Sequence, residues 1–383
     1  MACILKLPVR TVLGEGALEA AADAICRLGK KALLVTGNTV KKGEAFSRLT
    51  ALLTERGARW AVFSDIPGEP DDRIIDAGAK AFFDHGCDYL IGLGGGSPLD
   101  SAKAVAVRAA LPGSVVSHAG REIEGDLPRM ALIPTTAGTG SEATKFTVIT
   151  DSVKGAKLLL KGDCLLPDLA VVDYTLTLSV PPALTAFTGM DALTHAVEAF
   201  TSRKATPLTD PYAADAVKRI FANLPRAYAT GGDRAAREEM AIAAYEAGVS
   251  ISNASVTLVH GMSRPIGAKF HVPHGLSNAM LLAQCLSFAA AGRPDKFAAL
   301  ARLTGAARES DGDERAAEAL IQVLAALTAQ LEIPSPAGYG IPKEDFFRAI
   351  PQMAREALQS GSPGNTLREV TEQDIARLYE ALY

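Results

Sequence analysis

The chain has 383 residues and a formal net charge of −4, a balance that gives no reason to expect nucleic acid or an anionic membrane as a partner. It shows no basic start followed by an apolar stretch and no run of about 18 apolar residues, so neither secretion nor membrane spanning is expected. The five cysteines are scattered without CxxC spacing, which favours reduced thiols and a cytoplasmic location.

Strand-like and helix-like segments alternate through the first half of the chain. The apolar segments 31–36, 59–64 and 88–93 are typical of short buried strands, and residues 46–55 and 71–85 have the apolar spacing of helices. This βαβα order predicts a parallel sheet with helices on both faces.

The third strand leads into the glycine-rich segment GGGSPLD, residues 94–100, and then into a helix predicted for 101–110. This order suits a pyrophosphate, because backbone N–H groups at a helix N-terminus are unpaired and glycines let the phosphate approach them. The segment is neither GxGxxG nor a Walker A motif. On this pattern alone, dinucleotide binding and a plain tight turn both remain open.

A strand predicted for 130–134 is followed by TTAGTGS, residues 135–141. Its small hydroxyl residues and glycines form either a polar surface loop or a second wall around a bound nucleotide. Residues 146–150 and 157–160 flank a polar turn and predict an antiparallel hairpin, and 169–173 is the last predicted strand.

Strand patterns end near residue 181 and helical patterns follow. Helical spacing covers 183–201, 211–222, 235–250, 256–269, 276–290, 294–303, 314–331, 343–357 and 371–382. Because the chain is too long for one ordinary core, we predict an α/β domain at 1–180 and an all-helical domain at 181–383, with a cleft between them.

Most of the histidines lie in the helical half, with suggestive spacing. Asp191 and His195 are four residues apart in a predicted helix, so their side chains share one face. His260 and His274 flank two prolines, which predicts two helices meeting at a bend. One carboxylate and three imidazoles suit Fe²⁺ or Zn²⁺ with room for substrate. The alternative for the Asp/His pair is a solvated helix face or a cap.

The chain resembles the iron-containing (group III) alcohol dehydrogenase family, in particular its branch of lactaldehyde reductases and related short-chain alcohol dehydrogenases. The matching segments are GGGSPLDSAK (94–103), PTTAGTGSEAT (134–144), GMDALTHAVEA (189–199), HGMSRPIGAKFHVPHG (260–275) and the tail 338–383. The resemblance spans essentially the whole chain. It implies a Rossmann-like domain followed by an all-α domain, as in dehydroquinate synthase, and a homodimer.

The resemblance also implies the site residues. One catalytic divalent metal, Fe²⁺ or alternatively Zn²⁺, would be bound by Asp191, His195, His260 and His274. For the cofactor, NAD or NADP, the resemblance assigns the diphosphate to Gly94, Gly95, Gly96, Ser97 and Asp100. It places Thr135 and Thr136 beside the cofactor and Lys157 near its ribose. We count Gly37, Asn38 and Thr144 among the cofactor-binding residues as well.

Two departures from the family pattern matter. NAD-preferring members typically carry Asp where this chain has Gly37, and losing that carboxylate removes a charge that repels a 2′-phosphate. With Lys41 and Lys42 nearby, NADP or dual use is a hypothesis. Many relatives also have His where this chain has Arg264, which cannot relay a proton but can hold an anionic group of a substrate. A structural salt bridge is the alternative role for Arg264. His271 is either a proton relay or a solvated loop residue.

We therefore expect a metal-dependent, NAD(P)-linked alcohol dehydrogenase acting on a small alcohol or aldehyde by hydride transfer, with the metal as Lewis acid. One alternative is a maleylacetate reductase-like enzyme for a carboxylated oxo-substrate. A dehydroquinate synthase-type lyase is disfavoured, because such sites carry several basic residues whereas the metal region of this chain offers only Arg264 and Lys269. A non-catalytic nucleotide- or metal-binding protein is disfavoured by the complete ligand set.

Overall fold

The computed structural model describes residues 2–383 and divides into two compact units. One unit is Lys6–Val180, and the other is Pro181–Tyr383 together with the N-terminal residues up to Leu5. Over the described residues, no helix has both the length and the apolar character needed to cross a membrane.

A parallel sheet organises the Lys6–Val180 unit. Its strand order in the described part of the unit is β1-β8-β5-β4-β2-β3. The strands are β1 (Arg10–Leu13), β2 (Lys31–Thr36), β3 (Arg59–Phe63), β4 (Tyr89–Gly94), β5 (Arg129–Pro134) and β8 (Leu169–Val172). β6 (Phe146–Asp151) and β7 (Ala156–Lys161) form a separate antiparallel hairpin. The parallel sheet and the hairpin both agree with the sequence prediction.

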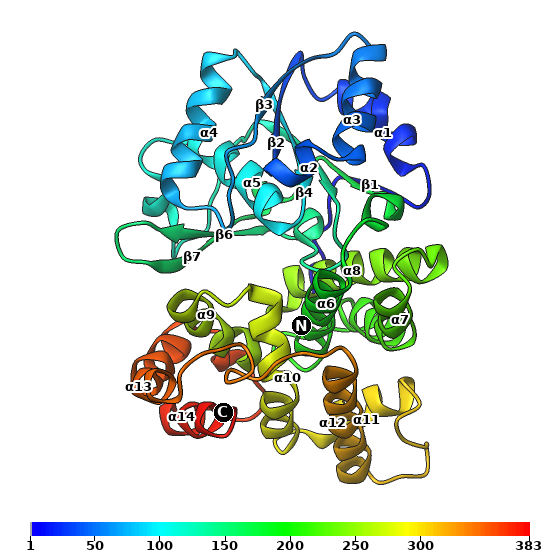
Figure 1. Ribbon diagram of the computed structural model, residues 1–383, viewed down its shortest axis with the longest axis vertical. Helices are drawn as coiled ribbons and strands as arrows, with labels where there is room; N and C mark the ends of the chain where they lie inside the picture. The colour runs from blue at the N-terminus through cyan, green and yellow to red at the C-terminus, as the bar shows by residue number, and fades with distance from the viewer. Residues whose placement is uncertain (1) are drawn as a thin grey trace. The chain divides into compact units, whose positions relative to one another are not determined.

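Both faces of the sheet are covered by helices, as Figure 1 shows. Successive side chains of a strand point to opposite faces. Leu33 and Val35 of β2 therefore belong to the core cluster beside α4 and α5, whereas Leu34 belongs to the cluster beside α1 and α3. The helices of this unit are α1 (Ala17–Cys26), α2 (Asn38–Lys41), α3 (Glu44–Glu55), α4 (Asp72–Asp84) and α5 (Gly96–Ala110). Double coverage explains why β2 and β4 are almost entirely apolar.

The helix after the glycine segment begins earlier than predicted. We expected it at residue 101, but α5 starts at Gly96 and includes most of the glycine segment. Pro98 is compatible with this start, because the first turn of a helix leaves its N–H groups unpaired and proline has none to lose. Gly94 has φ +149° and its Cβ would lie 2.7 Å from Cγ of Pro98, so the chain turns here only with glycine. The N-terminus of α5 thus lies directly after β4.

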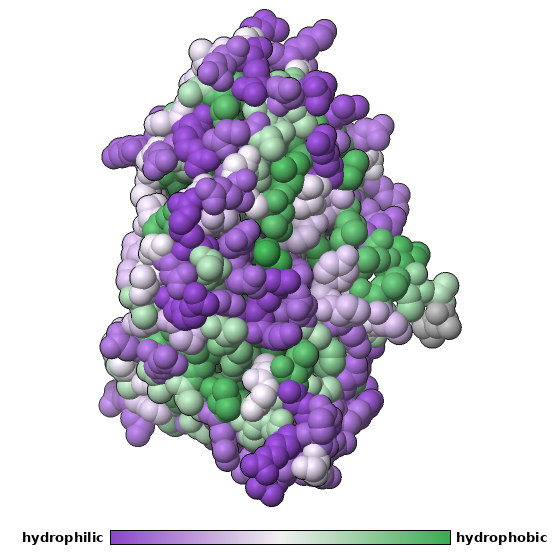
Figure 2. Space-filling view, turned by 90° about the vertical axis from the view of Figure 1, so that its right-hand side faces the viewer, coloured by the Kyte–Doolittle hydropathy of each residue, from purple (hydrophilic) through white to green (hydrophobic). Residues whose placement is uncertain are grey.

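Apolar side chains are exposed near the start of the chain. Ile4 is 74% and Val9 is 83% exposed, and Val9 directly precedes β1, which is an edge strand of the sheet. On the face shown in Figure 2, hydrophobic and hydrophilic residues are mixed, and one hydrophobic protrusion stands out. Exposed apolar side chains beside an edge strand form a surface that proteins usually cover.

The unit formed by Pro181–Tyr383 is built of helices, in agreement with the prediction. They are α6 (Pro182–Phe200), α7 (Asp210–Ala229), α8 (Arg234–Ala254), α9 (Leu258–Phe270), α10 (His274–Ala290), α11 (Pro294–Leu303), α12 (Asp313–Gln330), α13 (Lys343–Gln359) and α14 (Glu372–Glu380). α6 is buried almost continuously from Gly189 to Ala199, so it is the central helix of the unit.

Close packing between α6 and α10 sets the position of the candidate site. A Cβ on Gly275 would lie 2.4 Å from the carbonyl oxygen of Phe187 and 3.3 Å from Cβ of Asp191. Only glycine allows α10 to begin against α6 at this distance. The first residue of α10, His274, is therefore held next to Asp191.

Candidate metal centre and cofactor loops

α6 contributes two of the predicted metal ligands. Asp191 and His195 lie one turn apart on the same face of the helix, and both are buried. The Nε2 atom of His195 is 3.8 Å from Oδ1 of Asp191. Burial of a carboxylate is unfavourable unless it is paired or coordinates a cation, so this face of α6 needs partners from other helices.

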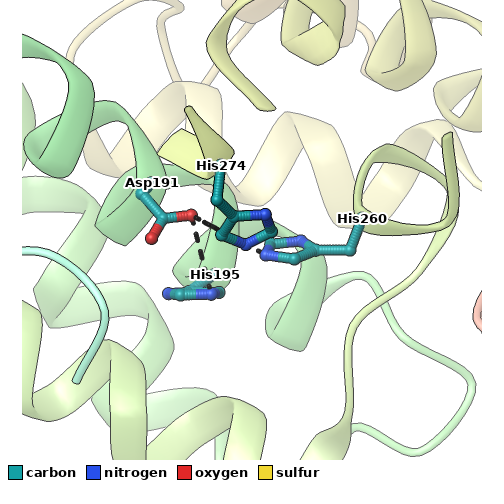
Figure 3. A group of neighbouring side chains, drawn as sticks. All are labelled: Asp191, His195, His260 and His274. Atoms are coloured by element: carbon teal, nitrogen blue, oxygen red, sulfur yellow. Dashed lines mark ion pairs between the residues drawn. The ribbon is translucent and has the colours of Figure 1, made fainter. Parts of the chain in front are cut away.

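α9 and α10 supply the other two ligands. The chain turns between these helices at His271, which has φ +54°, and α10 begins at His274 after Pro273. The Nε2 atoms of His260 and His274 lie 3.8 Å and 3.7 Å from Oδ1 of Asp191. Figure 3 shows the four side chains facing one another, and their ligand atoms all lie within 4.8 Å of one another.

The dimensions of this group suit a single first-row divalent cation. Bonds of about 2.0–2.2 Å to nitrogen and oxygen place tetrahedral ligand atoms roughly 3.4 Å apart, close to the observed separations of 3.7–3.8 Å. Three members are buried, whereas the side chain of His274 is 38% exposed. The group is therefore accessible from one side, as a catalytic metal site must be.

The position of Asn278, a residue that the sequence analysis did not select, shows that ligand atoms of the metal group point to one place. Its amide nitrogen lies 2.7 Å from Oδ1 of Asp191, 3.1 Å from Nε2 of His260 and 3.2 Å from Nε2 of His274. One donor within reach of three acceptor atoms occupies the kind of position that a cation takes. Asn278 follows His274 by one helical turn, so the i,i+4 rule could have selected it.

Glu198, also missed, orients His260. Its Oε2 atom is 2.5 Å from Nδ1 of His260, and its Oε1 atom accepts hydrogen bonds from the Thr257 hydroxyl and the Val259 N–H, each at 2.7 Å. A carboxylate that accepts the Nδ1 proton leaves Nε2 as a lone pair directed at Asp191. Glu198 is fully buried and lies one turn after His195 on α6, so helical spacing could have indicated it.

The pKa shifts of Asp191 and His260 favour the protonation states that bind a metal ion. Burial raises the pKa of Asp191, but the charges of His195, His274 and His260 outweigh burial and lower it overall. Burial and the neighbouring histidines lower the pKa of His260 well below its usual value. At neutral pH the group therefore presents an ionised carboxylate and a neutral His260 imidazole, the forms that bind metal.

The two glycine-rich loops of the other unit lie against each other. A Cβ on Gly96 would be 2.8 Å from Cγ2 of Thr139, and one on Gly95 would be 3.5 Å from the hydroxyl of Thr136. β4 and β5 are neighbouring parallel strands, with Gly94 paired to Pro134, so both loops leave the same edge of the sheet. The backbone N–H groups at the start of α5 are thus flanked by hydroxyl side chains, an arrangement that suits phosphate.

Hydrogen bonds of two buried charged side chains hold these loops together. Asp100 accepts hydrogen bonds from the Ser141 hydroxyl at 2.9 Å and the Val148 N–H at 3.0 Å. Lys103 is fully buried and its Nζ donates to the carbonyl and hydroxyl oxygens of Thr144 and to the carbonyl of Phe146. Burial lowers the pKa of Lys103 to about 8. In this structure the side chains of Asp100 and Thr144 therefore bond to protein groups, and their contact with a cofactor stays a prediction.

The remaining predicted cofactor residues lie at other points of the same unit. Gly37 and Asn38 follow β2, and a Cβ on Gly37 would meet only Cγ of Pro98 at an ordinary 3.8 Å. A side chain is therefore sterically acceptable at position 37. Lys157 pairs with Glu69 and donates to the Thr150 hydroxyl, and burial lowers its pKa to about 8.

The structure places the two predicted catalytic residues differently. Arg264 is half-buried on α9, one turn after His260, and its Nη1 donates to the Ser362 hydroxyl at 3.0 Å. No acidic side chain in residues 2–383 forms an ion pair with Arg264, and the charge of Glu198 acts on it only at longer range, so its role stays a prediction. His271 is exposed in the turn between α9 and α10, and its role as a relay remains a prediction.

Comparisons with known proteins agree along the whole chain. A model of the iron-containing alcohol dehydrogenase family matches residues 8–174, and a model of the C-terminal part of the Fe-containing alcohol dehydrogenase family matches 185–383. Lactaldehyde reductase of Escherichia coli (strain K12) is 36% identical over 378 residues, covering 97% of each chain. A crystal structure of 1,3-propanediol oxidoreductase is 34% identical, with a TM-score of 0.96 and full coverage of both chains. Sulfoacetaldehyde reductase of Bifidobacterium kashiwanohense, solved with NAD⁺, is 29% identical, with a TM-score of 0.88 over 100% of this chain and 99% of that one.

Proposed function

Because this chain belongs to the iron-containing alcohol dehydrogenase family, we propose that it is a metal-dependent, NAD(P)-linked alcohol dehydrogenase that interconverts a small alcohol and its aldehyde. The observation that carries the proposal is the group Asp191, His195, His260 and His274, whose ligand atoms lie within 4.8 Å of one another. The names of the relatives, a lactaldehyde reductase and a 1,3-propanediol oxidoreductase, support small oxygenated substrates.

The four side chains would hold one Fe²⁺ or Zn²⁺ ion. Such an ion supplies Lewis acidity, which polarises a carbonyl and favours the ionised form of an alcohol. Asp191 contributes a negative charge to the group of ligands, and Glu198 keeps Nε2 of His260 free of a proton. Glu198 and Asn278 thus position the group, and burial of three of its four members excludes water from all but the His274 side.

NAD or NADP would supply or accept the hydride at its nicotinamide ring. In aldehyde reduction the hydride goes to the carbonyl carbon and a proton goes to the oxygen; alcohol oxidation reverses both transfers. We propose that the backbone N–H groups at the start of α5 bind the cofactor diphosphate. Thr135 and Thr136 would lie beside the cofactor, and Lys157 near its ribose. The absence of a carboxylate at Gly37 supports use of NADP beside NAD.

The test is aldehyde-dependent oxidation of NADH and NADPH by purified protein, before and after metal removal by a chelator. We expect turnover that chelation abolishes and Fe²⁺ or Zn²⁺ restores. Asp191→Asn should not recover on metal addition, whereas the matched change Asp345→Asn, at an exposed residue of the same unit, should behave like wild type. A lyase or a binding protein would show no net cofactor oxidation, and that result would refute the proposal.

We also propose a homodimer, in which the edge strand β1 and the exposed Ile4 and Val9 contribute to the interface. Sedimentation of the protein at several concentrations tests this. A species of 40.0 kDa throughout would contradict it.

A further inference from the structure

Arg264 carries a positive charge that lacks a carboxylate partner. It is half-buried on α9, and its one hydrogen bond in the described chain goes to the neutral hydroxyl of Ser362. A guanidinium has five N–H donors in a rigid fork, so most of its donors are unused by the protein. Burial lowers the pKa of Arg264, but arginine stays charged at neutral pH. A charge in this state needs an anion, and the protein supplies none at ion-pair distance.

The guanidinium belongs to the surroundings of the metal centre. Arg264 follows the ligand His260 by four residues, which places both side chains on one face of α9 with Cβ atoms roughly 6 Å apart. A short substrate bound at the four ligands would therefore reach the Arg264 guanidinium with its other end.

The charge balance favours an anion at this place. Asp191 and Glu198 together carry two negative charges, which match those of one divalent cation. The charge of Arg264 then remains uncompensated. Glu198 acts on Arg264 at longer range, but its own oxygens are already engaged by Thr257, Val259 and His260.

The guanidinium is held by an anchored segment. Ser362 precedes Pro363, and a Cβ on Gly261 would lie 2.7 Å from Cδ of Pro363, so this segment packs closely on α9. The Asn365 amide donates to the carbonyl of Val256 at 2.9 Å. Such anchoring fixes the fork before a ligand arrives, which reduces the entropic cost of binding.

We infer that Arg264 determines substrate specificity by binding the anionic end of a short aldehyde or alcohol, namely a carboxylate, sulfonate or phosphonate. Each of these groups offers two oxygens to the guanidinium fork. The inference rests on the proposed function, since it assigns a substrate class to the same site. It predicts that this protein prefers a short anionic aldehyde to a neutral aldehyde of the same length.

The experiment compares kcat/KM of the metal-loaded enzyme on short aldehydes of equal length that end in a methyl, carboxylate, sulfonate, phosphonate or trimethylammonium group. We expect the anionic members to be preferred, and the series identifies which anion fits. In Arg264→Gln the ratio of anionic to neutral kcat/KM should fall roughly 10- to 100-fold, as expected for loss of a charged hydrogen bond. Arg264→Lys should retain part of the preference, because it keeps the charge but loses the fork.

Arg348→Gln is the control, because Arg348 is an exposed arginine of the same unit and its loss should leave the ratio unchanged. An unchanged ratio in Arg264→Gln, or a wild-type preference for neutral or cationic aldehydes, would overturn the inference. Should Arg264→Gln fail to fold, Ser362→Ala and Arg264→Lys replace it, because both changes should weaken binding of the anion and lower the ratio of anionic to neutral kcat/KM.

A binding measurement separates this inference from the proposed function. Ethanesulfonate is an unreactive anion, and its affinity for wild type and Arg264→Gln can be measured by calorimetry without turnover. Weaker binding to the variant supports the anion site even if no aldehyde is reduced, whereas equal binding refutes it. Absence of turnover on every aldehyde would count against the proposed function alone.

Discussion

Replacing Glu198 by Gln tests how the buried carboxylate sets the protonation of His260. In the wild type, Oε2 lies 2.5 Å from Nδ1 and Oε1 accepts from Thr257 and Val259. A glutamine can keep its oxygen towards those two donors, which turns its NH₂ group towards Nδ1. His260 must then accept at Nδ1 and carry its proton on Nε2, the atom that faces Asp191. The variant therefore loses a metal ligand without losing bulk.

We expect the affinity for Fe²⁺ or Zn²⁺ to fall by about 10- to 100-fold, which is typical for loss of a carboxylate that orients a ligating histidine. This corresponds to about 1.4–2.7 kcal/mol of binding free energy. Competition with a coloured chelator measures the affinity directly, without reference to activity. Glu318→Gln, at an exposed residue on α12, is the matched control. Equal metal affinity of Glu198→Gln and wild type would refute the reasoning.

Two further changes test the cofactor unit. The substitution Gly37→Asp is sterically acceptable and places a carboxylate after β2. The ratio of kcat/KM with NADH to kcat/KM with NADPH should therefore rise. An unchanged ratio would show that position 37 does not face the adenosine ribose. Lys103 has its pKa lowered from 10.5 to about 8 by burial, so the unfolded chain binds more protons than the folded one between these values. Lys103 therefore makes the free energy of unfolding rise as pH increases from 8 to 10.5. Denaturant titrations over this interval should show a smaller rise in Lys103→Met than in wild type. An equal rise of the unfolding free energy in both proteins would contradict this.

The architecture was predictable because its signals are local. Buried parallel strands produce short apolar segments such as 88–93, and the helical half has long periodic segments with few breaks. The four ligands could also be selected, since Asp191 and His195 share a helix face and the two prolines indicate a bend between His260 and His274. These inferences need only spacing along the chain.

The residues that were missed act through contacts between distant segments. Lys103 donates hydrogen bonds to Thr144 and Phe146, some 40 residues away, and no periodic pattern in the sequence indicates such hydrogen bonds. Glu198 and Asn278 do stand one helical turn from a ligand, but many polar residues meet that condition without touching a site. The early start of α5 at Gly96 was missed because a glycine segment with a proline is more often a turn than a first helical turn.

We propose that Asp191, His195, His260 and His274 bind one divalent cation on which turnover depends. The most direct test is to titrate Fe²⁺ or Zn²⁺ into metal-free protein while measuring both bound metal and cofactor oxidation. We expect activity to rise in proportion to metal occupancy and to saturate at one ion per chain, and we expect His260→Ala and His274→Ala to show neither effect. Full turnover by protein free of metal, or saturation unaffected by these substitutions, would contradict it.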